Sequence, residues 1–455
     1  MPNPVKREHW SSRTTFLLAI TGASVGLGNL WRFPYIAGEN GGGAFVLLYL
    51  IFILVIGIPL VMAELAMGKR GSRNPVSSLA LICREERKPH FWHGIGWFSI
   101  LAPLLATTFY SVIAGWSLYY LFKALTNTFS GMSAAQADQL FTQLLATPST
   151  LMLLHSCYLA AAVYVVGRGI RRGIEQVTKV MMPLLFVLLL CLAAYANLAG
   201  DAAAGWRFLF YPDFSALSGQ VVLMALGQAL FSISVGTGAL ITYGSYLAQE
   251  ISIPKAAWTI GLVDTGTALL AGLAIFPIVF ASGLAPTEGP GLMFVTLPIA
   301  LGNMPGGPVL SLLFFALVFL AAFTSSLAML EPFVSWLTEH KGFDRFKVAL
   351  AVGCGVWLVG LGALFSFNLL ADFRPLSMLP LFQDRNIFSV IDFIVSNLML
   401  PINALLIALF AGWVMNTDRL LEQMGLTGAI APRIWIVATR YLAPLALLSV
   451  FIFNF

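Results

Sequence analysis

The residues best suited to binding chemistry are three glycines in one apolar stretch, Gly22, Gly26 and Gly28, followed directly by Asn29. Each glycine costs an α-helix about 1 kcal/mol relative to alanine, so this stretch predicts a membrane-crossing helix that is unwound at its middle. Freed carbonyl groups suit a cation, and freed N–H groups at the start of the next half-helix suit a carboxylate. We therefore expect a site for a small anionic or zwitterionic solute beside a metal cation. A glycine-lined packing face between helices is the alternative.

A second apolar stretch repeats this design. In the run 219–248, Gly236 and Gly238 lie at the middle and follow Phe231, Ser232 and Ser234. Two interrupted spans in corresponding positions of two five-span halves are typical of an inverted-repeat transporter, whose solute lies where the repeats meet. The repetition favours a transporter over a packing face.

Several polar residues lie inside other apolar runs. Asp264 is a functional candidate because an intramembrane acid is costly. The hydroxyl groups of Thr324 and Ser325 either bond back to their own helix or bind a hard cation that prefers oxygen ligands. Tyr110 is either a core residue with a satisfied hydroxyl or part of a lid over the solute.

The elements that must position these residues are membrane spans. The chain has 455 residues, of which 59% are hydrophobic and 10% charged, and no soluble domain of this size has that composition. We expect an all-α polytopic membrane protein with eleven transmembrane helices, of which helices 1 and 6 are unwound. The expected spans are 14–37, 42–68, 95–124, 148–167, 175–198, 219–248, 256–283, 308–338, 347–367, 387–415 and 432–453.

Charge sets the expected orientation. Most of the 25 Lys and Arg residues fall in the loops on one side of the expected spans, so the net charge of +5 does not indicate nucleic-acid binding. The positive-inside rule then predicts a cytoplasmic N-terminus and, with eleven spans, an external C-terminus. The expected divisions are a cytoplasmic N-terminal segment with an inner latch (1–12), a first repeat (13–200), a second repeat (201–415) with an external lid at 284–307, and a last span (416–455).

Two further features suggest moving parts. Gly173 and Pro183 mark a segment that either opens locally toward the cytoplasm or forms a static kink. Arg32 and Asp392 lie toward the outer side of their spans, and we predict that they pair as an external latch.

Five motifs carry a family resemblance. They are KREHW (6–10), VGLGNLWRFPY (25–35), ENGGGAF (39–45), SxxxGxGA (232–239) and TSS (324–326). With them the whole chain resembles the neurotransmitter:sodium symporter family, and is most similar to its bacterial amino-acid transporters with eleven spans. The resemblance implies a LeuT-type 5+5 inverted-repeat fold, sodium-coupled import of an amino acid by alternating access, and a place in the bacterial inner membrane.

The resemblance also implies site residues. One sodium site would use Ser24, Asn29, Ser232 and Asp264. The other would use main-chain carbonyls of Gly22, Val25 and Ala321 with the hydroxyls of Thr324 and Ser325. The implied substrate contacts are Ala23, Ser24, Gly26, Gly28, Ala106, Tyr110, Phe231, Ser232, Ser234, Thr237, Gly238, Ser325 and Met329. The implied moving parts are an outer gate of Arg32 with Asp392, an inner latch of Arg7 with Glu339 under Trp10, and a hinge at Gly173 and Pro183.

Departures from the family pattern refine the function. Chloride-dependent members have a serine in span 7 where this chain has Ala268, and Asp264 stands where Asn is usual. We predict no chloride site, with Asp264 or bound protons balancing the charge. Ala23, Ala106, Thr237 and Met329 leave room for a large side chain. No acid at positions 23 or 24 is present to hold an amine that lacks a carboxylate, which favours a large apolar or aromatic α-amino acid.

Other function classes remain open alternatives. A conducting channel or a non-transporting amino-acid sensor could use the same broken helices. An intramembrane enzyme is disfavoured because the sequence has no HExxH, no GxSxG and no paired intramembrane aspartates in a shared motif. The expected partners are therefore sodium, a small amino acid and the lipid bilayer.

Overall fold

The computed structural model describes residues 8–248, 250–284 and 291–454, and these ranges fold into helices without a strand. Within them, nine helices are long and apolar enough to cross a membrane. A tenth crossing is a pair of helices, Arg13–Ser24 and Gly28–Glu39, bent by 49° at a short break. Two shorter helices, α11 (Gly219–Ser232) and α12 (Ala239–Gly244), occupy the place of the expected sixth span.

The unbroken crossings follow the expected spans to within a few residues, although π-helical turns divide several of them. In chain order they are α3–η2–α4 (Gly43–Gly71), α6 (Gly94–Leu125), α8 (Pro148–Gly167), η4–α9 (Ile170–Ala199), α13 (Ile253–Ala281), α15 (Gly307–Lys341), α16 (Arg345–Phe365), α17–η8–α18–η9 (Ile387–Val414) and α20–η10–α21 (Ile430–Asn454).

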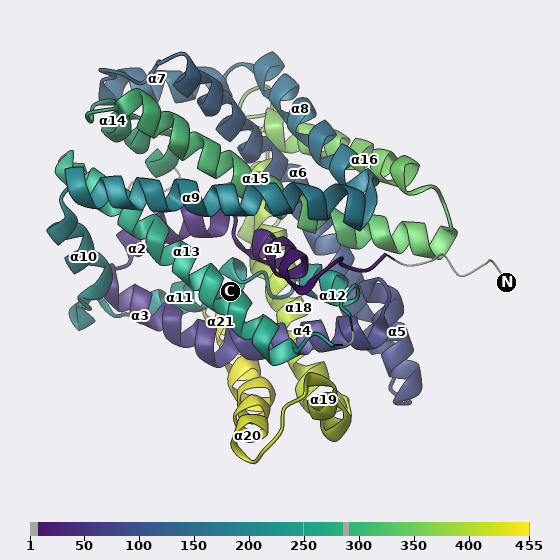
Figure 1. The fold of residues 1–455 in the computed structure, drawn as a ribbon. Helices are drawn as coiled ribbons and strands as arrows, with labels where there is room; N and C mark the ends of the chain where they lie inside the picture. Colours follow the sequence, from purple (N-terminus) through teal and green to yellow (C-terminus); the bar gives the residue numbers. More distant parts are fainter. Residues whose placement is uncertain (1–7, 249, 285–290, 455) are drawn as a thin grey trace.

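Short helices mark the two ends of the bundle. The first described residues, which precede α1 (Arg13–Ser24), lie at the end where α5 (Pro75–Glu85) lies, whereas α7 (Ala134–Leu145), α10 (Ala202–Phe210) and α14 (Leu297–Gly302) gather at the opposite end (Figure 1). The described part of the expected lid is η6 (Leu292–Thr296) with α14. Residues 285–290 of that lid lie outside the described residues.

The first break is shorter than the glycine pattern predicts. Helix α1 (Arg13–Ser24) continues through Gly22 and ends at Val25, which has ψ near 99°, and a π-helical turn, η1 (Gly28–Arg32), leads into α2 (Phe33–Glu39). Gly22 serves close packing between helices rather than unwinding, because a Cβ there would lie 3.0 Å from the Met182 sulfur and 3.2 Å from the Thr324 Cβ. The unwound residues of the first break are Val25 and Gly26, because Leu27 already has right-handed helical backbone.

The second break is longer and depends on left-handed backbone. Residues 233–238 separate α11 from α12, and Ser234, Gly236 and Gly238 have φ of 59°, 81° and 70°. Glycine adopts these angles without a steric penalty, whereas Ser234 does so at a cost. The second break therefore lies at Gly236 and Gly238, as the sequence predicts.

Neighbouring helices brace both breaks with buried polar side chains. Glu64 on α4 (Ile58–Gly71) accepts a hydrogen bond from the Gly236 N–H at 2.8 Å, and Asn403 on α18 donates to the Gly236 carbonyl at 2.7 Å. Gln228 donates to the Gly28 carbonyl at 2.9 Å. These side chains replace part of the hydrogen bonding that a continuous helix would have supplied.

The expected hinge is helical in this structure. Gly173 lies in the π-helical turn η4 (Ile170–Ile174), and Pro183 lies inside α9 (Glu175–Ala199). A Cβ at Gly173 would lie 2.0 Å from the Val165 carbonyl oxygen, so the turn after α8 needs a glycine at this position. Local opening of this segment stays a prediction.

The brace at Gly236 predicts a stability difference between two variants. Glu64→Ala leaves the buried Gly236 N–H without its acceptor, which costs about 1–3 kcal/mol. We expect a lower midpoint of thermal unfolding for the purified Glu64→Ala protein than for the native protein. Glu64→Gln is the control, because its amide oxygen can still accept the bond. Equal midpoints for native protein and Glu64→Ala would contradict the brace.

Candidate solute and sodium sites

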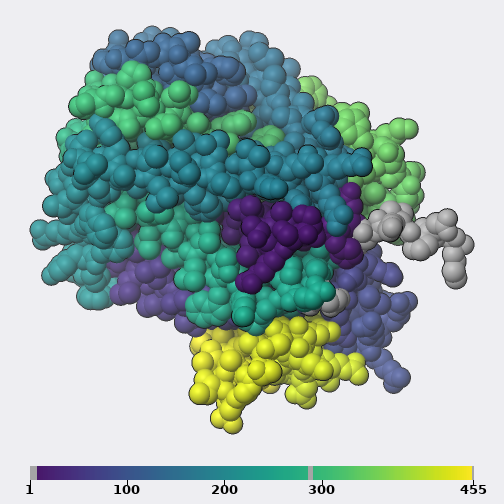
Figure 2. Space-filling model, viewed as in Figure 1, coloured from purple at the N-terminus to yellow at the C-terminus, as the bar shows by residue number. Residues whose placement is uncertain are grey.

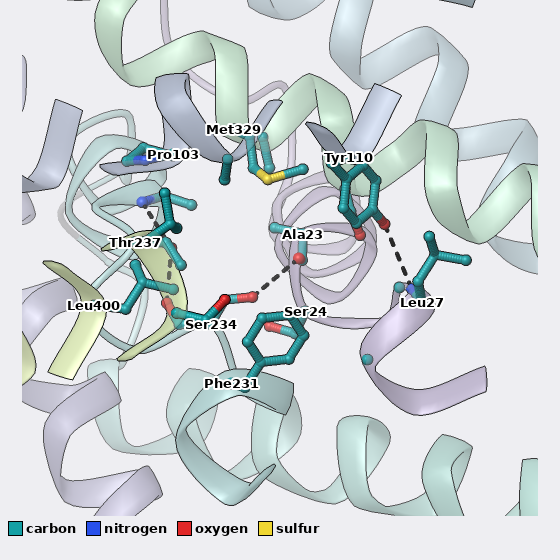
Figure 3. A pocket seen from close by; sticks show the side chains of 18 of the residues that line it. Ala23, Ser24, Leu27, Pro103, Tyr110, Phe231, Ser234, Thr237, Met329 and Leu400 are labelled. Atoms are coloured by element: carbon teal, nitrogen blue, oxygen red, sulfur yellow. Dashed lines mark hydrogen bonds between the residues drawn. The ribbon is translucent and has the colours of Figure 1, made fainter. Parts of the chain in front are cut away.

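The two breaks border one cavity of about 80 Å³. In Figure 3, Ala23, Ser24 and Leu27, at or next to the first break, face Phe231, Ser234 and Thr237, at or next to the second, while Tyr110 and Met329 close other sides. No Asp, Glu, Lys, Arg or His is among the described residues that line the cavity. Any charge on a bound solute must therefore be met by main-chain groups, hydroxyl groups or an accompanying ion.

Most of the residues expected to contact the substrate line this cavity. They are Ala23, Ser24, Gly26, Gly28, Ala106, Tyr110, Phe231, Ser234, Thr237, Ser325 and Met329. Ser232 and Gly238 do not line it. The Ser232 hydroxyl donates instead to Asp264, and Gly238 packs so closely that a Cβ would lie 2.1 Å from the Ser99 carbonyl oxygen.

Other lining residues were not predicted from the sequence. Leu27, Pro103, Phe109, Ala239, Ala328, Val395, Ser396 and Leu400 also line the cavity. Most are apolar residues in apolar helices, so only the packing of the helices distinguishes them from the rest of the core. Leu27 is the exception, because its place between Gly26 and Gly28 could have indicated it.

Hydrogen bonds across the cavity show where donors and acceptors lie. The Ser234 hydroxyl donates to the Ala23 carbonyl at 3.2 Å, which links the two breaks directly (Figure 3). The Leu27 N–H points to the Tyr110 hydroxyl at 3.5 Å, a long contact. One side of the cavity thus offers carbonyl oxygens and the other an N–H with a phenol.

The five residues expected at one sodium site lie together. The Ser325 hydroxyl is 3.4 Å from the Gly22 carbonyl oxygen and 3.5 Å from that of Val25. The Thr324 hydroxyl lies 3.2 Å from the Ala321 carbonyl oxygen. Two oxygens that share a hard cation at about 2.3–2.6 Å, at a right angle, lie about 3.3–3.7 Å apart. The Ser325 spacings therefore fit a shared cation better than they fit strong hydrogen bonds.

The other expected sodium site is a buried polar cluster around Asp264. Asn29 donates to one Asp264 carboxylate oxygen at 2.8 Å, and the Ser232 hydroxyl donates to the other at 2.6 Å. Tyr49 also donates to Asp264, at 3.3 Å. The sequence analysis did not predict this contact, although the position of a tyrosine inside an apolar span could have indicated it. Ser24 lines the adjacent cavity, and its hydroxyl lies 3.4 Å from the Ile20 carbonyl oxygen.

The predicted outer gate is not paired in this structure. Between Arg32 and Asp392, both within the described ranges, there is no ion pair within 4 Å. The Arg32 guanidinium lies over the Phe231 ring at 4.3 Å, and Asp392 accepts a hydrogen bond from Ser396 at 2.9 Å. Each partner is held by another neighbour, so their pairing stays a prediction for a closed state.

The predicted inner latch is only partly described. Trp10 packs against Tyr243 and Tyr246 and donates to the Tyr243 carbonyl at 3.2 Å. Glu339 accepts hydrogen bonds from the Asn74 main chain and side-chain amide at 2.9 and 2.7 Å. Arg7 lies outside the described residues, so its predicted pairing with Glu339 is not tested.

A second ion pair lies nearby and was not predicted. Glu331 is fully buried, pairs with Arg345 and accepts a hydrogen bond from the Tyr246 hydroxyl at 3.0 Å. Arg345 also donates to the Val166 carbonyl at 3.0 Å. An acid inside an apolar span was the available signal, because such an acid is expected to have a partner.

Two broken helices, braced from outside and facing each other across a cavity, define a secondary membrane transporter. The chain belongs to the sodium:neurotransmitter symporter family, whose model matches residues 7–139 and 142–455. It is therefore a sodium-dependent, multi-pass membrane transporter, and the family is one of transporters rather than enzymes.

Two relatives are similar over nearly the whole chain. A sodium-dependent transporter of Bacillus subtilis, YhdH, is 36% identical over 98% of this chain and 97% of its own length. The crystal structure of MhsT in complex with L-phenylalanine matches with a TM-score of 0.90 at 40% identity, covering 99% of this chain and 100% of that one. This likeness confirms the expected LeuT-type fold. The sodium- and chloride-dependent taurine transporter of Bos taurus is 28% identical over 80% of this chain.

The space at Gly26 predicts the effect of one methyl group. A Cβ at Gly26 would lie 2.4 Å from the Ser325 hydroxyl oxygen and 3.3 Å from that of Tyr110. We expect Gly26→Ala to weaken both sodium and solute binding about tenfold or more, measured by scintillation proximity binding on purified protein. Gly355→Ala on α16 is the control, because a Cβ there meets nothing within 4 Å. Native affinity in Gly26→Ala would contradict the placement of the site.

Proposed function

We propose that this transporter imports L-amino acids with large apolar or aromatic side chains, coupled to sodium at two sites and independently of chloride. The observation that carries the proposal is the cavity between the breaks, which has carbonyl oxygens at one side, an N–H and a phenol at the other, and no charged side chain in its described lining. In the proposed orientation the N-terminus is cytoplasmic.

The polar ends of the cavity suit the two charges of an α-amino acid. Its carboxylate would lie at the Leu27 N–H and the Tyr110 hydroxyl, at the start of the half-helix that follows the first break. Its ammonium group would lie at the carbonyl oxygens of Ala23 and Phe231, on the other side of the cavity. The sodium site around Asp264 is adjacent, because Asn29 accepts a hydrogen bond from the Gly26 N–H at 3.2 Å.

The rest of the cavity suits an uncharged side chain. Ala106, Ala328, Pro103, Met329 and Leu400 are apolar, and the Thr237 hydroxyl already donates to the Ser234 carbonyl at 2.8 Å. A lysine or aspartate side chain would be buried here without a counter-charge, which costs far more than the contact returns. A phenyl or indole ring instead meets small residues and an adaptable methionine.

Sodium supplies the driving force for accumulation. Each sodium ion that moves inward contributes about 2.3 kcal/mol per 100 mV of membrane potential, in addition to its concentration gradient. In the proposed cycle, sodium favours an outward-open state, and bound substrate permits closure and inward release. The Arg32–Asp392 pair would form on closure, because Arg32 lies over Phe231 and Asp392 accepts a hydrogen bond from Ser396, and Arg32, Phe231 and Ser396 line one pocket.

A substrate panel tests the proposal. Protein reconstituted into proteoliposomes should accumulate phenylalanine, tryptophan, tyrosine and leucine in a saturable way only with an inward sodium gradient. Glycine, taurine, lysine and aspartate should compete weakly. Ala106→Leu reduces the cavity and should weaken tryptophan uptake more than leucine uptake, whereas Ala161→Leu, on an exposed position of α8, is the control.

The same panel separates the alternatives. Preference for glycine or taurine would overturn the substrate assignment. Large currents without saturation would indicate a channel, and binding without accumulation would indicate a sensor.

Chloride independence rests on the groups around Asp264. The hydroxyls of Tyr49 and Ser232 are donors that an anion could use, but both donate to the Asp264 carboxylate. Ala268, one turn further along α13, is buried and offers only a methyl group. The fixed charge of Asp264 would therefore take the place of a bound anion.

Anion replacement tests this assignment. Uptake should be unchanged when gluconate replaces chloride on both sides of the membrane. Asp264→Asn removes the fixed charge and should raise the sodium concentration for half-maximal uptake about tenfold. Uptake that stops without chloride in the native protein would contradict the proposal.

A further inference from the structure

The segment between α16 and α17, residues 366–386, exposes a run of large apolar side chains. They are Leu369, Phe373, Met378, Leu379 and Leu381, and Met378 is 94% exposed. The segment that follows α6 lies at the same end of the bundle, because α6 and α16 are the third and ninth crossings. Its residues 126–139, all within the described ranges, expose no large apolar side chain. Several exposed apolar side chains close together mark a surface that meets a partner or a membrane.

Helix α16 places this segment at the edge of the hydrocarbon core of the bilayer. With its 21 residues, Arg345–Phe365, the helix is about 31 Å long, and the core is about 30 Å thick. The helix and the core therefore end together, and the segment begins in the interfacial layer. Its other end joins a crossing helix too, because α17 (Ile387–Phe393) follows directly.

The exposed side chains are of the kind that the crossing helices present to lipid. Helix α9 lies lengthwise across the face drawn in Figure 2, and it exposes Val180, Val187 and Leu190. Helix α16 exposes Leu358, at 62%, and Val359. Beyond the end of α16, the segment thus presents the same type of surface as a helix that faces lipid.

The other side of the segment is fixed to α17. Phe382 is buried and packs against Val390 and Phe393, with 5.4 Å between the ring centroids of Phe382 and Phe393. The Phe382 N–H donates to the Leu379 carbonyl at 2.9 Å, so main-chain groups of the segment find partners that lipid could not supply. Since this packing fixes the segment against α17, its exposed side chains are held on the outer side.

Two arginines in the segment, Arg374 and Arg385, suit lipid phosphate groups. Each donates to a main-chain carbonyl of its own segment, at 2.5 and 3.2 Å. Within the described ranges neither lies within 4 Å of a carboxylate, although Asp372 and Asp384 are close in the sequence. A guanidinium beside apolar side chains can bind a phosphate while its neighbours enter the hydrocarbon core. This combination favours a phospholipid layer over a protein partner.

We propose that residues 369–385 form an interfacial anchor, with their exposed apolar side chains in a lipid leaflet and Arg374 and Arg385 at its phosphate groups. In the proposed orientation this is the outer leaflet. The anchor fixes the level of the start of α17, which also carries Asp392 of the predicted outer gate. The proposal depends on the chain being a membrane transporter and not on the proposed substrate.

Hydroxyl-radical footprinting of the native protein, in nanodiscs that each hold one transporter, tests the anchor. Met378 should be oxidised about tenfold more slowly than the methionine introduced by Asp138→Met, because a side chain in the leaflet is seldom exposed to water. Asp138 is the reference because it is exposed on α7, at the same end of the bundle. Equal rates would place the segment in water and overturn the proposal. Protection found only in discs with two transporters would indicate a contact between copies, which would also overturn it.

A charge at Met378 gives a second measurement. Met378→Glu should lift the segment from the leaflet, because a carboxylate in an apolar layer is costly, and should speed labelling of Phe373 and Leu379 about fivefold. Met378→Leu is the matched control and should leave both labelling rates unchanged. Equal labelling in the two variants would show that packing within the protein alone protects these residues, which would disprove the anchor. The measurement on the native protein stands even if Met378→Glu fails to fold.

Discussion

The structure depends on one constraint: main-chain groups freed inside an apolar bundle must find partners without water. At the second break, Gly236 gives its N–H to Glu64 and its carbonyl to Asn403. At the first, the Gly28 carbonyl accepts a bond from Gln228. Glu64, Asn403 and Gln228 do not themselves line the cavity, so other main-chain atoms of the breaks can face inward. The binding surface therefore consists of the main-chain groups at the two breaks that these side chains do not bind.

Charge is distributed in keeping with that constraint. The described cavity lining is neutral, whereas the fully buried acids Asp264 and Glu331 are not part of that lining and have donors of their own. Asp264 is bound by Asn29, Ser232 and Tyr49, and Glu331 is paired with Arg345. A neutral cavity beside a fixed negative charge can hold a zwitterion together with a cation at low electrostatic cost. It also disfavours solutes with a net charge in their side chain.

The sequence predicted the features that depend on local chemistry. Glycines indicated both breaks, apolar runs indicated the spans, and intramembrane polar residues indicated Asp264, Thr324 and Ser325. Prediction from the sequence failed for features that depend on which helices pack against each other. Leu400 and Pro103 line the cavity only because α18 and α6 pack there. Gly22 lies in a continuous helix, where its lack of a side chain leaves room for Met182 and Thr324. The Arg32–Asp392 pair and an opened Gly173–Pro183 segment concern other conformations, which one structure does not contain.

The hydrogen bond from Ser234 to the Ala23 carbonyl has a thermodynamic consequence. In the proposed orientation, this hydroxyl occupies the acceptor that a substrate ammonium group would use. Binding is then an exchange of one donor for another, and the vacant carrier keeps its two halves tied together. The charged ammonium donor forms a stronger bond than the hydroxyl that it replaces, but only the difference favours loading, so ring burial and sodium must supply the rest. A solute that lacks either an amine or a ring would not displace the Ser234 hydroxyl from the Ala23 carbonyl.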